Sequence, residues 1–182
     1  MTVPNLLTFS RILMTPLLMW FLVHRELNHA LIAFFIAGMT DGLDGLVARL
    51  LHQKSRSGAI LDPLADKFLL VSSFLLLGYL GLIPAWLVII AVARDVVILL
   101  GTLTLFVFRF QLEVQPTILG KLTTLLQLLT VLLALSSELI SVAAWIKTLV
   151  FVITAIFSVA SGIQYVRKGI SIAQSQGLQS NR

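Results

Sequence analysis

Four aspartates are concentrated in residues 41–66 of a chain that has only 8 acidic residues among its 182. Asp41 and Asp44 are three residues apart, and on a helix they would share one face. Asp62 and Asp66 are four residues apart and would also share a face. If the two helices pack antiparallel, all four carboxylates come to the same depth and repel one another strongly. Bound divalent cations are the simplest way to neutralise that repulsion.

The ligand chemistry favours hard cations. The donors are all carboxylate oxygens, the chain has no cysteine, and the nearest histidine, His52, falls in a predicted loop. Such donors suit Mg²⁺ or Mn²⁺ rather than Zn²⁺, and four carboxylates can hold two ions. Two-metal sites serve phosphoryl and nucleotidyl transfer, in which they stabilise the attacking and leaving oxygens. The neighbouring residues Gly42, Gly45, Ala48 and Gly58 leave room either for a bulky ligand or for close helix packing, and both interpretations stay open.

The elements that carry these aspartates are those of a membrane protein. Hydrophobic residues make up 58% of the chain, charged residues 12%, and the mean hydropathy is +1.01. A water-soluble or disordered chain of this size is excluded, because it could not hide that much apolar surface. A membrane helix needs about 20 mostly apolar residues. Six segments meet this requirement: 5–24, 28–50, 59–80, 84–110, 118–138 and 142–167.

We therefore expect an all-α integral membrane protein with six transmembrane helices. Residues 1–182 would form a single domain, with a polar tail at about 172–182. Most basic residues, among them Arg49, Arg109 and Arg167, fall on the side that both termini share. The excess of Lys and Arg on that side predicts that both termini, and with them the aspartates, face the cytoplasm. The net charge of +5 suits an interaction with anionic lipid headgroups. A nucleic-acid partner is not expected, because the chain has no basic run with interleaved aromatic residues.

The spacing from Asp41 to Asp66 matches a known motif. It is D-x2-D-G-x2-A-R-x8-G-x3-D-x3-D without a departure, and it resembles the signature of the CDP-alcohol phosphotransferases, or phosphatidyltransferases. The opening string PNLLTFSRI, ARDV at 93–96 and GKLTTLLQ at 120–127 extend the resemblance over nearly the whole chain. The resemblance implies a six-helix homodimer that cleaves a CDP-linked lipid such as CDP-diacylglycerol. Its phosphate-bearing part would pass to an alcohol, with release of CMP.

The resemblance also implies a role for each residue of the motif. Asp41, Asp44 and Asp62 would bind both metal ions, and Asp66 would complete the second metal site and act as general base. The nucleotide site would be lined by Asn5, Thr8, Asp41, Gly45, Ala48, Arg49 and Gly58. The chemistry agrees, since an arginine carries a permanent charge and a bidentate fork suited to phosphate oxygens. A carboxylate beside a dication stays ionised at neutral pH and can accept a proton from an acceptor hydroxyl.

Two acceptor alcohols compete. Arg94 and Lys121 resemble family positions at the acceptor pocket. Members that form phosphatidylglycerophosphate usually carry A-R-E and a second arginine two turns later, whereas this chain has Asp95 and Thr102 at those places. A smaller set of cations suits a singly charged phosphodiester, and the strings AGMTDGLDG and LDPLADK are similar to the CMP-forming, cardiolipin-synthesising members. The sequence therefore favours phosphatidylglycerol as the acceptor.

Glycerol-3-phosphate is the alternative acceptor within the family, and it would give phosphatidylglycerophosphate. Its phosphomonoester carries nearly two negative charges, which Arg109 or Lys67 could help to balance in place of the missing arginine. An alternative of another class is a cation transporter, because intramembrane carboxylates can form an ion pathway. The predicted position of the aspartates near one surface, and the lack of an inverted repeat, disfavour it. For Arg94 and Asp95, simple ion pairing within the membrane is as good an explanation as a functional role.

Overall fold

The computed structural model describes the backbone of residues 3–51, 58–107 and 117–177, which is helical apart from the turns. Within these segments, the side chains at 3–12, 41–51, 58–66, 103, 105–107, 138 and 172–177 lie outside the description. The helices are α1 (Val3–Val23), α2 (Leu27–Leu51), α3 (Gly58–Tyr79), α4 (Ala85–Val107), α5 (Ile118–Leu135), the short 3₁₀ helix η1 (Ser136–Glu138) and α6 (Ala144–Gly177). The all-α fold and the six expected helices are confirmed.

Turn chemistry separates the helices where the sequence changes composition. Gly81 adopts a φ of +76°, a left-handed conformation that glycine tolerates at no steric cost, and it ends the turn that follows α3. The carbonyl of Pro84 accepts the first backbone hydrogen bonds of α4, from the N–H groups of Leu87 and Val88. Thr117 caps α5, because its side-chain oxygen accepts a hydrogen bond from the N–H of Gly120 at 3.1 Å.

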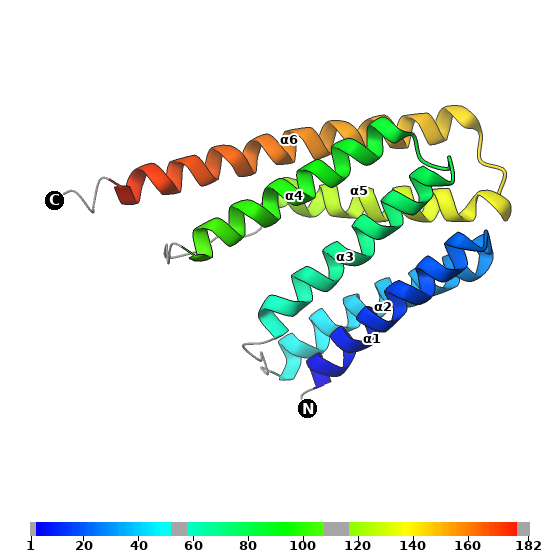
Figure 1. Cartoon of the computed structure of the whole chain (residues 1–182), viewed down its shortest axis with the longest axis horizontal. Coiled ribbons are helices and arrows are strands. Elements are labelled where there is room, and N and C mark those ends of the chain that lie inside the picture. The colour runs from blue at the N-terminus through cyan, green and yellow to red at the C-terminus, as the bar shows by residue number, and fades with distance from the viewer. Residues whose placement is uncertain (1–2, 52–57, 108–116, 178–182) are drawn as a thin grey trace.

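The last helix is longer than the sequence pattern indicates. The final apolar segment was expected to end at about residue 167, whereas α6 continues to Gly177, so the first part of the predicted polar tail is helical. Residues 172–176 read Ile-Ala-Gln-Ser-Gln, which contains no proline or glycine to stop a helix. Loss of hydrophobicity alone therefore does not end this helix, and α6 projects beyond its apolar stretch (Figure 1).

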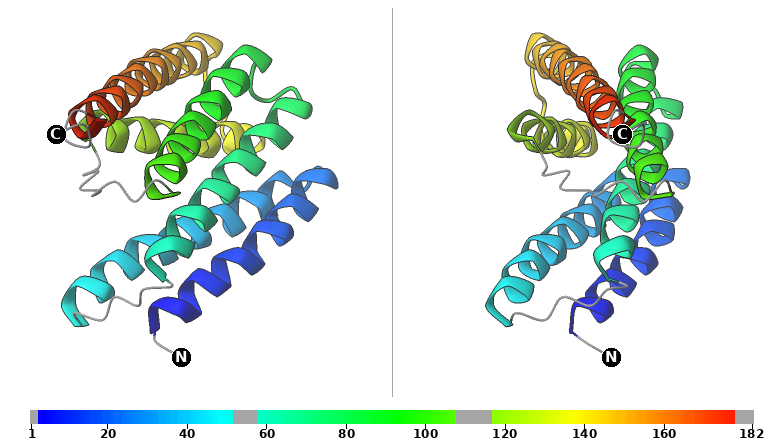
Figure 2. Two further views of the ribbon diagram at one scale, coloured as in Figure 1. Left: turned by 60° about the vertical axis from the view of Figure 1, so that its left-hand side comes forward. Right: turned by 90° about the vertical axis from the view of Figure 1, so that its left-hand side faces the viewer.

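The six helices form two groups of three. α1 contacts α2 and α3 extensively, while α6 contacts α4 and α5 (Figures 1 and 2). The contact of α3 with α4 joins the two groups. The α1–α2, α3–α4 and α5–α6 turns all lie at one end of the molecule. The C-terminal end of α2 and the N-terminal end of α3, which carry the aspartates, lie at the opposite end.

The described core lies toward the end that holds the turns. Its largest fully buried side chains include Phe34, Phe74, Leu77 and Leu87. Close approach of α3 to α4 at this end depends on Gly78, where a Cβ would lie 2.7 Å from a Val88 methyl carbon. Burial of each of these aromatic and leucine side chains contributes about 1.5–3 kcal/mol to the stability of this end. The aspartates therefore occur at the ends of α2 and α3 that are farther from this described core.

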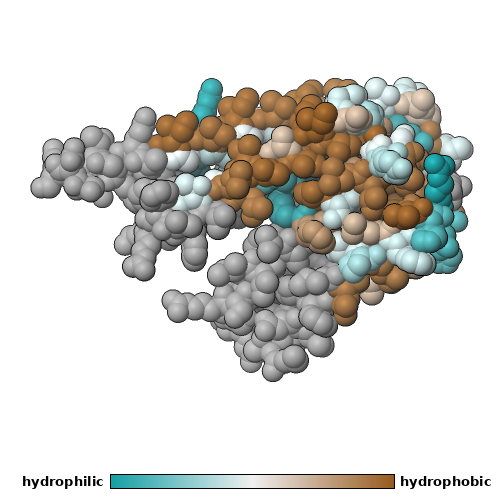
Figure 3. Space-filling model, viewed as in Figure 1, coloured by the Kyte–Doolittle hydropathy of each residue, from teal (hydrophilic) through white to brown (hydrophobic). Residues whose placement is uncertain are grey.

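Among the residues whose side chains are described, three helical stretches are long and apolar enough to cross a membrane: Ala85–Thr102 in α4, Ile118–Leu135 in α5 and Ala144–Ser171 in α6. Shorter apolar stretches occur in the described parts of the first three helices, at Leu13–Val23, Leu27–Thr40 and Lys67–Tyr79. The outer face of α4 and α6 is covered by apolar side chains (Figure 3). Such a surface suits hydrocarbon rather than water. The structure thus supports the membrane class, while six full spans stay a prediction.

Candidate active site

The two pairs of aspartates occur on two helices that end and begin at the same end of the molecule. Asp41 and Asp44 fall in the last three turns of α2, and Asp62 and Asp66 fall in the first three turns of α3 (Figure 2). The helical backbone agrees with the spacing argument, because each pair lies within about one turn. Their side chains lie outside the described ones, so the metal site itself stays a prediction.

The residues predicted for the nucleotide also fall on these helices. Asn5 and Thr8 are in α1, Gly45, Ala48 and Arg49 are in α2, and Gly58 is the first residue of α3. Among the side chains that the structure describes, no group of three or more His, Asp or Glu could hold a metal ion. The predicted donor set lies outside that part of the chain. Its chemistry, four carboxylates without Cys or His, fits Mg²⁺ or Mn²⁺.

A buried ion cluster lies one residue further along α3. Lys67, which directly follows Asp66, reaches across to α4 and forms an ion pair with Asp95 Oδ1. The same oxygen accepts a hydrogen bond from Arg94 Nη1 at 2.6 Å. Asp95 is only 4% exposed, so its charge is compensated by the two cations rather than by water. This cluster joins the turn of α3 that carries Asp66 to α4.

Arg94 connects three helices. Its Nε and Nη2 lie 3.3 and 3.0 Å from Ser161 Oγ of α6, and Nη2 also lies 3.3 Å from the carbonyl oxygen of Gly120 in α5. The residue is 6% exposed. A Cβ at Gly120 would lie 3.0 Å from Tyr165 Oη, so the absence of a side chain there lets α5 approach α6 at the level of the guanidinium. Arg94 is thus fixed in position by several partners.

The two residues predicted to bind the acceptor line one pocket. Arg94 from α4 and Lys121 from α5 lie at a cavity of about 380 Å³, together with Lys67 from α3. Thr124 and Tyr165 add hydroxyl groups to the same wall. The described lining therefore offers three cations and two hydroxyl groups. Asp95 compensates part of this positive charge through its ion pairs with Lys67 and Arg94. Such a pocket can bind a phosphate that carries one or two negative charges.

Three of these partners were not identified from the sequence: Tyr165, Ser161 and Thr124. The sequence does contain a signal for the first two, because Ser161 and Tyr165 are four residues apart on a mainly apolar stretch of helix and so share a face. Lys67 was considered from the sequence as a substitute for a missing arginine, and its pairing with Asp95 was not predicted. The structure gives it a definite position, on Asp95 and at the edge of the pocket.

Polar side chains also hold α5 against α6 below the pocket. Thr123 Oγ1 donates to the carbonyl of Phe157 at 3.1 Å, and Thr130 and Thr154 share a hydrogen bond of 2.9 Å. Interhelical hydrogen bonds of this kind contribute about 0.6 kcal/mol each in membrane proteins, with small side chains allowing the close approach. They keep Lys121, near the start of α5, in register with Tyr165 of α6.

Removal of the shared carboxylate should destabilise the fold. We expect Asp95→Asn to lower the free energy of unfolding by about 3 kcal/mol, because Arg94 and Lys67 would lose their common partner in a poorly hydrated site. Denaturation in mixed detergent micelles measures this loss. Glu26→Gln is the matched control, since Glu26 is exposed and its ion pair with His29, at 3.2 Å, lies on the surface, and it should change stability by less than about 0.5 kcal/mol. Equal stability of the two variants would contradict the buried cluster.

Comparison with known proteins agrees with the motif. The CDP-alcohol phosphatidyltransferase family matches residues 1–160 of the chain. A CMP-forming cardiolipin synthase of Rattus norvegicus is 40% identical over 121 residues, which cover 66% of this chain and 39% of that protein. The corresponding Homo sapiens protein is 38% identical over the same length. A CDP-diacylglycerol–glycerol-3-phosphate 3-phosphatidyltransferase of Aquifex aeolicus is 35% identical over 129 residues, covering 69% of this chain and 70% of that protein.

These matches favour an enzyme over a cation transporter. The matched part of the chain spans about 39% of the length of the rat and human relatives, but 70% of the Aquifex aeolicus relative. The names of the two kinds of relative differ, because one states cardiolipin synthesis with formation of CMP and the other states glycerol-3-phosphate as the acceptor.

Proposed function

Because the chain belongs to the CDP-alcohol phosphatidyltransferase family, we propose that it transfers the phosphatidyl group of CDP-diacylglycerol to phosphatidylglycerol, which gives cardiolipin and CMP. The observation that favours this acceptor is the position of Asp95. Its carboxylate takes up part of the charge of Arg94 and Lys67 at the pocket, and so leaves a site better matched to one negative charge than to two.

In this proposal the aspartates provide the chemistry of transfer. Asp41, Asp44, Asp62 and Asp66 would hold two Mg²⁺ or Mn²⁺ ions, which when bound stabilise negative charge on the diphosphate and on departing CMP. The acceptor hydroxyl attacks the phosphorus that bears the diacylglycerol, and its proton passes to the Asp66 carboxylate. As the new ester bond forms, the phosphoanhydride bond from that phosphorus to the phosphate oxygen of CMP breaks, and CMP leaves with that oxygen.

The remaining residues bind and orient the two substrates. Asn5, Thr8, Asp41, Gly45, Ala48, Arg49 and Gly58 would line the site of the cytidine diphosphate moiety. Arg94 and Lys121 would bind the phosphate of the acceptor. The hydrogen bonds from Arg94 to Ser161 and Gly120 support this role, since a guanidinium held in place loses little freedom when it binds a phosphate. Tyr165 lies beside Gly120 and would add a hydroxyl to the same phosphate.

The setting of the reaction is part of the same proposal. We place six helices across the membrane, with both termini and the active site on the cytoplasmic side, because most Lys and Arg residues fall there. The protein would act as a homodimer, with membrane phospholipids as its substrates and surroundings.

A comparison of acceptors tests the proposed reaction. Purified protein in mixed micelles with Mg²⁺ and CDP-diacylglycerol is given either phosphatidylglycerol or glycerol-3-phosphate, and the lipid products are identified by mass spectrometry. We expect cardiolipin and CMP from the first, and weaker or no product from the second. Formation of phosphatidylglycerophosphate alone would reverse the choice of acceptor.

Glycerol-3-phosphate is the second candidate acceptor, and two observations favour it. Three cations, Lys67, Arg94 and Lys121, lie at one pocket, as a phosphomonoester would require. The Aquifex aeolicus relative, whose name states this acceptor, is matched over 70% of its length. The side-by-side assay distinguishes the two acceptors directly, because only one of the two products contains four acyl chains.

A further inference from the structure

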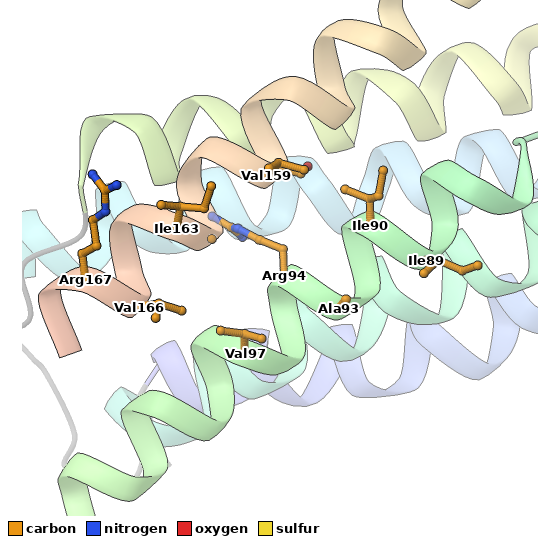
Figure 4. Close-up of a pocket in the computed structure, with 11 residues that line it drawn as sticks. Ile89, Ile90, Ala93, Arg94, Val97, Val159, Ile163, Val166 and Arg167 are labelled. Atoms are coloured by element: carbon orange, nitrogen blue, oxygen red, sulfur yellow. The ribbon is translucent and has the colours of Figure 1, made fainter. Parts of the chain in front are cut away.

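A second cavity, separate from the polar pocket, lies between α4 and α6. It has a volume of about 560 Å³ and is lined mainly by aliphatic side chains (Figure 4). Ile89, Ile90 and Val97 contribute from α4, and Val159, Ile163 and Val166 contribute from α6. We refer to it as the α4–α6 groove. A volume of this size lies within the range of ligand-binding pockets, roughly 300–1,000 Å³.

The position of the groove restricts what can enter it. Its α4 side falls within the apolar stretch Ala85–Thr102, and its α6 side falls within Ala144–Ser171. Both stretches are long and apolar enough to lie in the hydrocarbon of a membrane. An occupant of the groove is therefore an apolar chain from the bilayer rather than a water-soluble metabolite.

Arg94 lines both cavities. Its side chain extends from α4 toward Ile163 of α6 in the groove, and the same residue forms part of the wall of the polar pocket with Lys121 (Figure 4). Arg167 supplies a second cation to the lining of the groove, in the turn of α6 after Ile163. An anionic amphiphile fits this arrangement, because its phosphate would contact Arg94 while its chain lies against the aliphatic side chains.

We infer that the α4–α6 groove holds an acyl chain of the phosphatidylglycerol acceptor and thereby selects a lipid acceptor over a soluble one. The inference rests on the proposed reaction, and it adds the part of the protein that recognises the acyl portion of the acceptor. Glycerol-3-phosphate carries no chain and would leave the groove unused. The groove is then a determinant of specificity that acts through substrate binding.

Filling the groove tests this assignment. Ala93 lines the groove and is exposed, so that Ala93→Trp would occupy space there without entering the core. Ala160 on α6 is also exposed but does not belong to the groove lining, and Ala160→Trp is the matched control. Phosphatidyl transfer, followed as CMP release, is measured with long-chain phosphatidylglycerol and with its deacylated headgroup, glycerophosphoglycerol.

We expect Ala93→Trp to raise the KM for long-chain phosphatidylglycerol about tenfold, which corresponds to about 1.4 kcal/mol and to the burial of about two methylene groups. Transfer to glycerophosphoglycerol should change less than about twofold in either variant. Ala160→Trp should leave both acceptors unaffected. Equal KM values for the two variants would overturn the groove assignment, as would an equal loss with both acceptors in Ala93→Trp.

A binding measurement separates this inference from the proposed reaction. Phosphatidylglycerol with a diazirine in its acyl chain is photolysed with the protein in the absence of CDP-diacylglycerol, and labelled peptides are identified. We expect peptides of α4 and α6 to be labelled. Excess unlabelled phosphatidylglycerol should suppress this labelling, whereas phosphatidylcholine should not. The Ala93→Trp variant should not be labelled at these peptides. Equal suppression by both lipids would show bulk bilayer lipid and overturn the inference. Specific labelling without cardiolipin formation would overturn the proposed reaction and the role of phosphatidylglycerol as acceptor. The groove would then be a binding site for this lipid alone.

Discussion

Chelation of divalent cations should reduce turnover by on the order of a thousandfold or more, and Mg²⁺ or Mn²⁺ should restore it. The reason is electrostatic. Asp41, Asp44, Asp62 and Asp66 would together present four negative charges to a diphosphate, and without cations they would repel the substrate that they must bind. CMP release from CDP-diacylglycerol is measured with excess EDTA and after addition of each metal ion.

Two further measurements make the chelation result specific. Zn²⁺ should restore activity poorly, because an all-carboxylate donor set suits harder cations. As an independent measurement, the thermal stability of the protein in detergent should fall on chelation and recover with Mg²⁺, because the four carboxylates repel one another once the cations are removed. Full turnover in excess EDTA would show that the motif does not act through metal ions.

The helices could be predicted from the sequence because one strong signal determines them. Apolar runs of about 20 residues, interrupted by polar or turn-forming residues such as Gly81 and Pro84, mark each helix within a few residues of its observed ends. The end of α6 departs from this pattern. Hydrophobicity reports where a segment leaves hydrocarbon, whereas a helical backbone can continue into polar sequence, as α6 does up to Gly177.

The site was predicted only in part, because spacing describes one helix at a time. The pairs on α2 and α3 are visible as three- and four-residue separations, and Arg94 and Lys121 do meet at one pocket. The second cation that pairs with Asp95 could not be found from spacing along one helix. Arg94 is adjacent to Asp95 in sequence, but the second cation, Lys67, comes from another helix and is brought close only by tertiary packing. The α4–α6 groove could not be predicted for the same reason, because it forms only where two helices pack together.

The ion cluster explains why Asp66 deserves to be tested separately from the other aspartates. Lys67 anchors its turn of α3 to α4 through Asp95, next to the pocket that holds Arg94. A carboxylate in this turn would therefore be close to the proposed acceptor, whereas Asp41 and Asp44 belong to a different helix, α2. Proton acceptance requires the carboxylate to lie within hydrogen-bond reach of the acceptor hydroxyl. The packing of α3 against α4 supports Asp66 in that role.

Asp66→Asn should lower kcat by about two to four orders of magnitude, because the amide cannot accept the proton of the attacking hydroxyl. Binding of CDP-diacylglycerol should be partly retained, since three carboxylates would still hold metal. Asp41→Asn is the matched comparison. It removes a ligand proposed for both ions, and should therefore weaken metal and nucleotide binding, seen as a higher metal requirement and a higher KM. Steady-state kinetics at saturating Mg²⁺, with binding of CDP-diacylglycerol measured separately, distinguish the two patterns. If Asp66→Asn kept a kcat within a few-fold of the unmodified protein, the proton would have to be accepted elsewhere, and Asp66 would be a metal ligand alone.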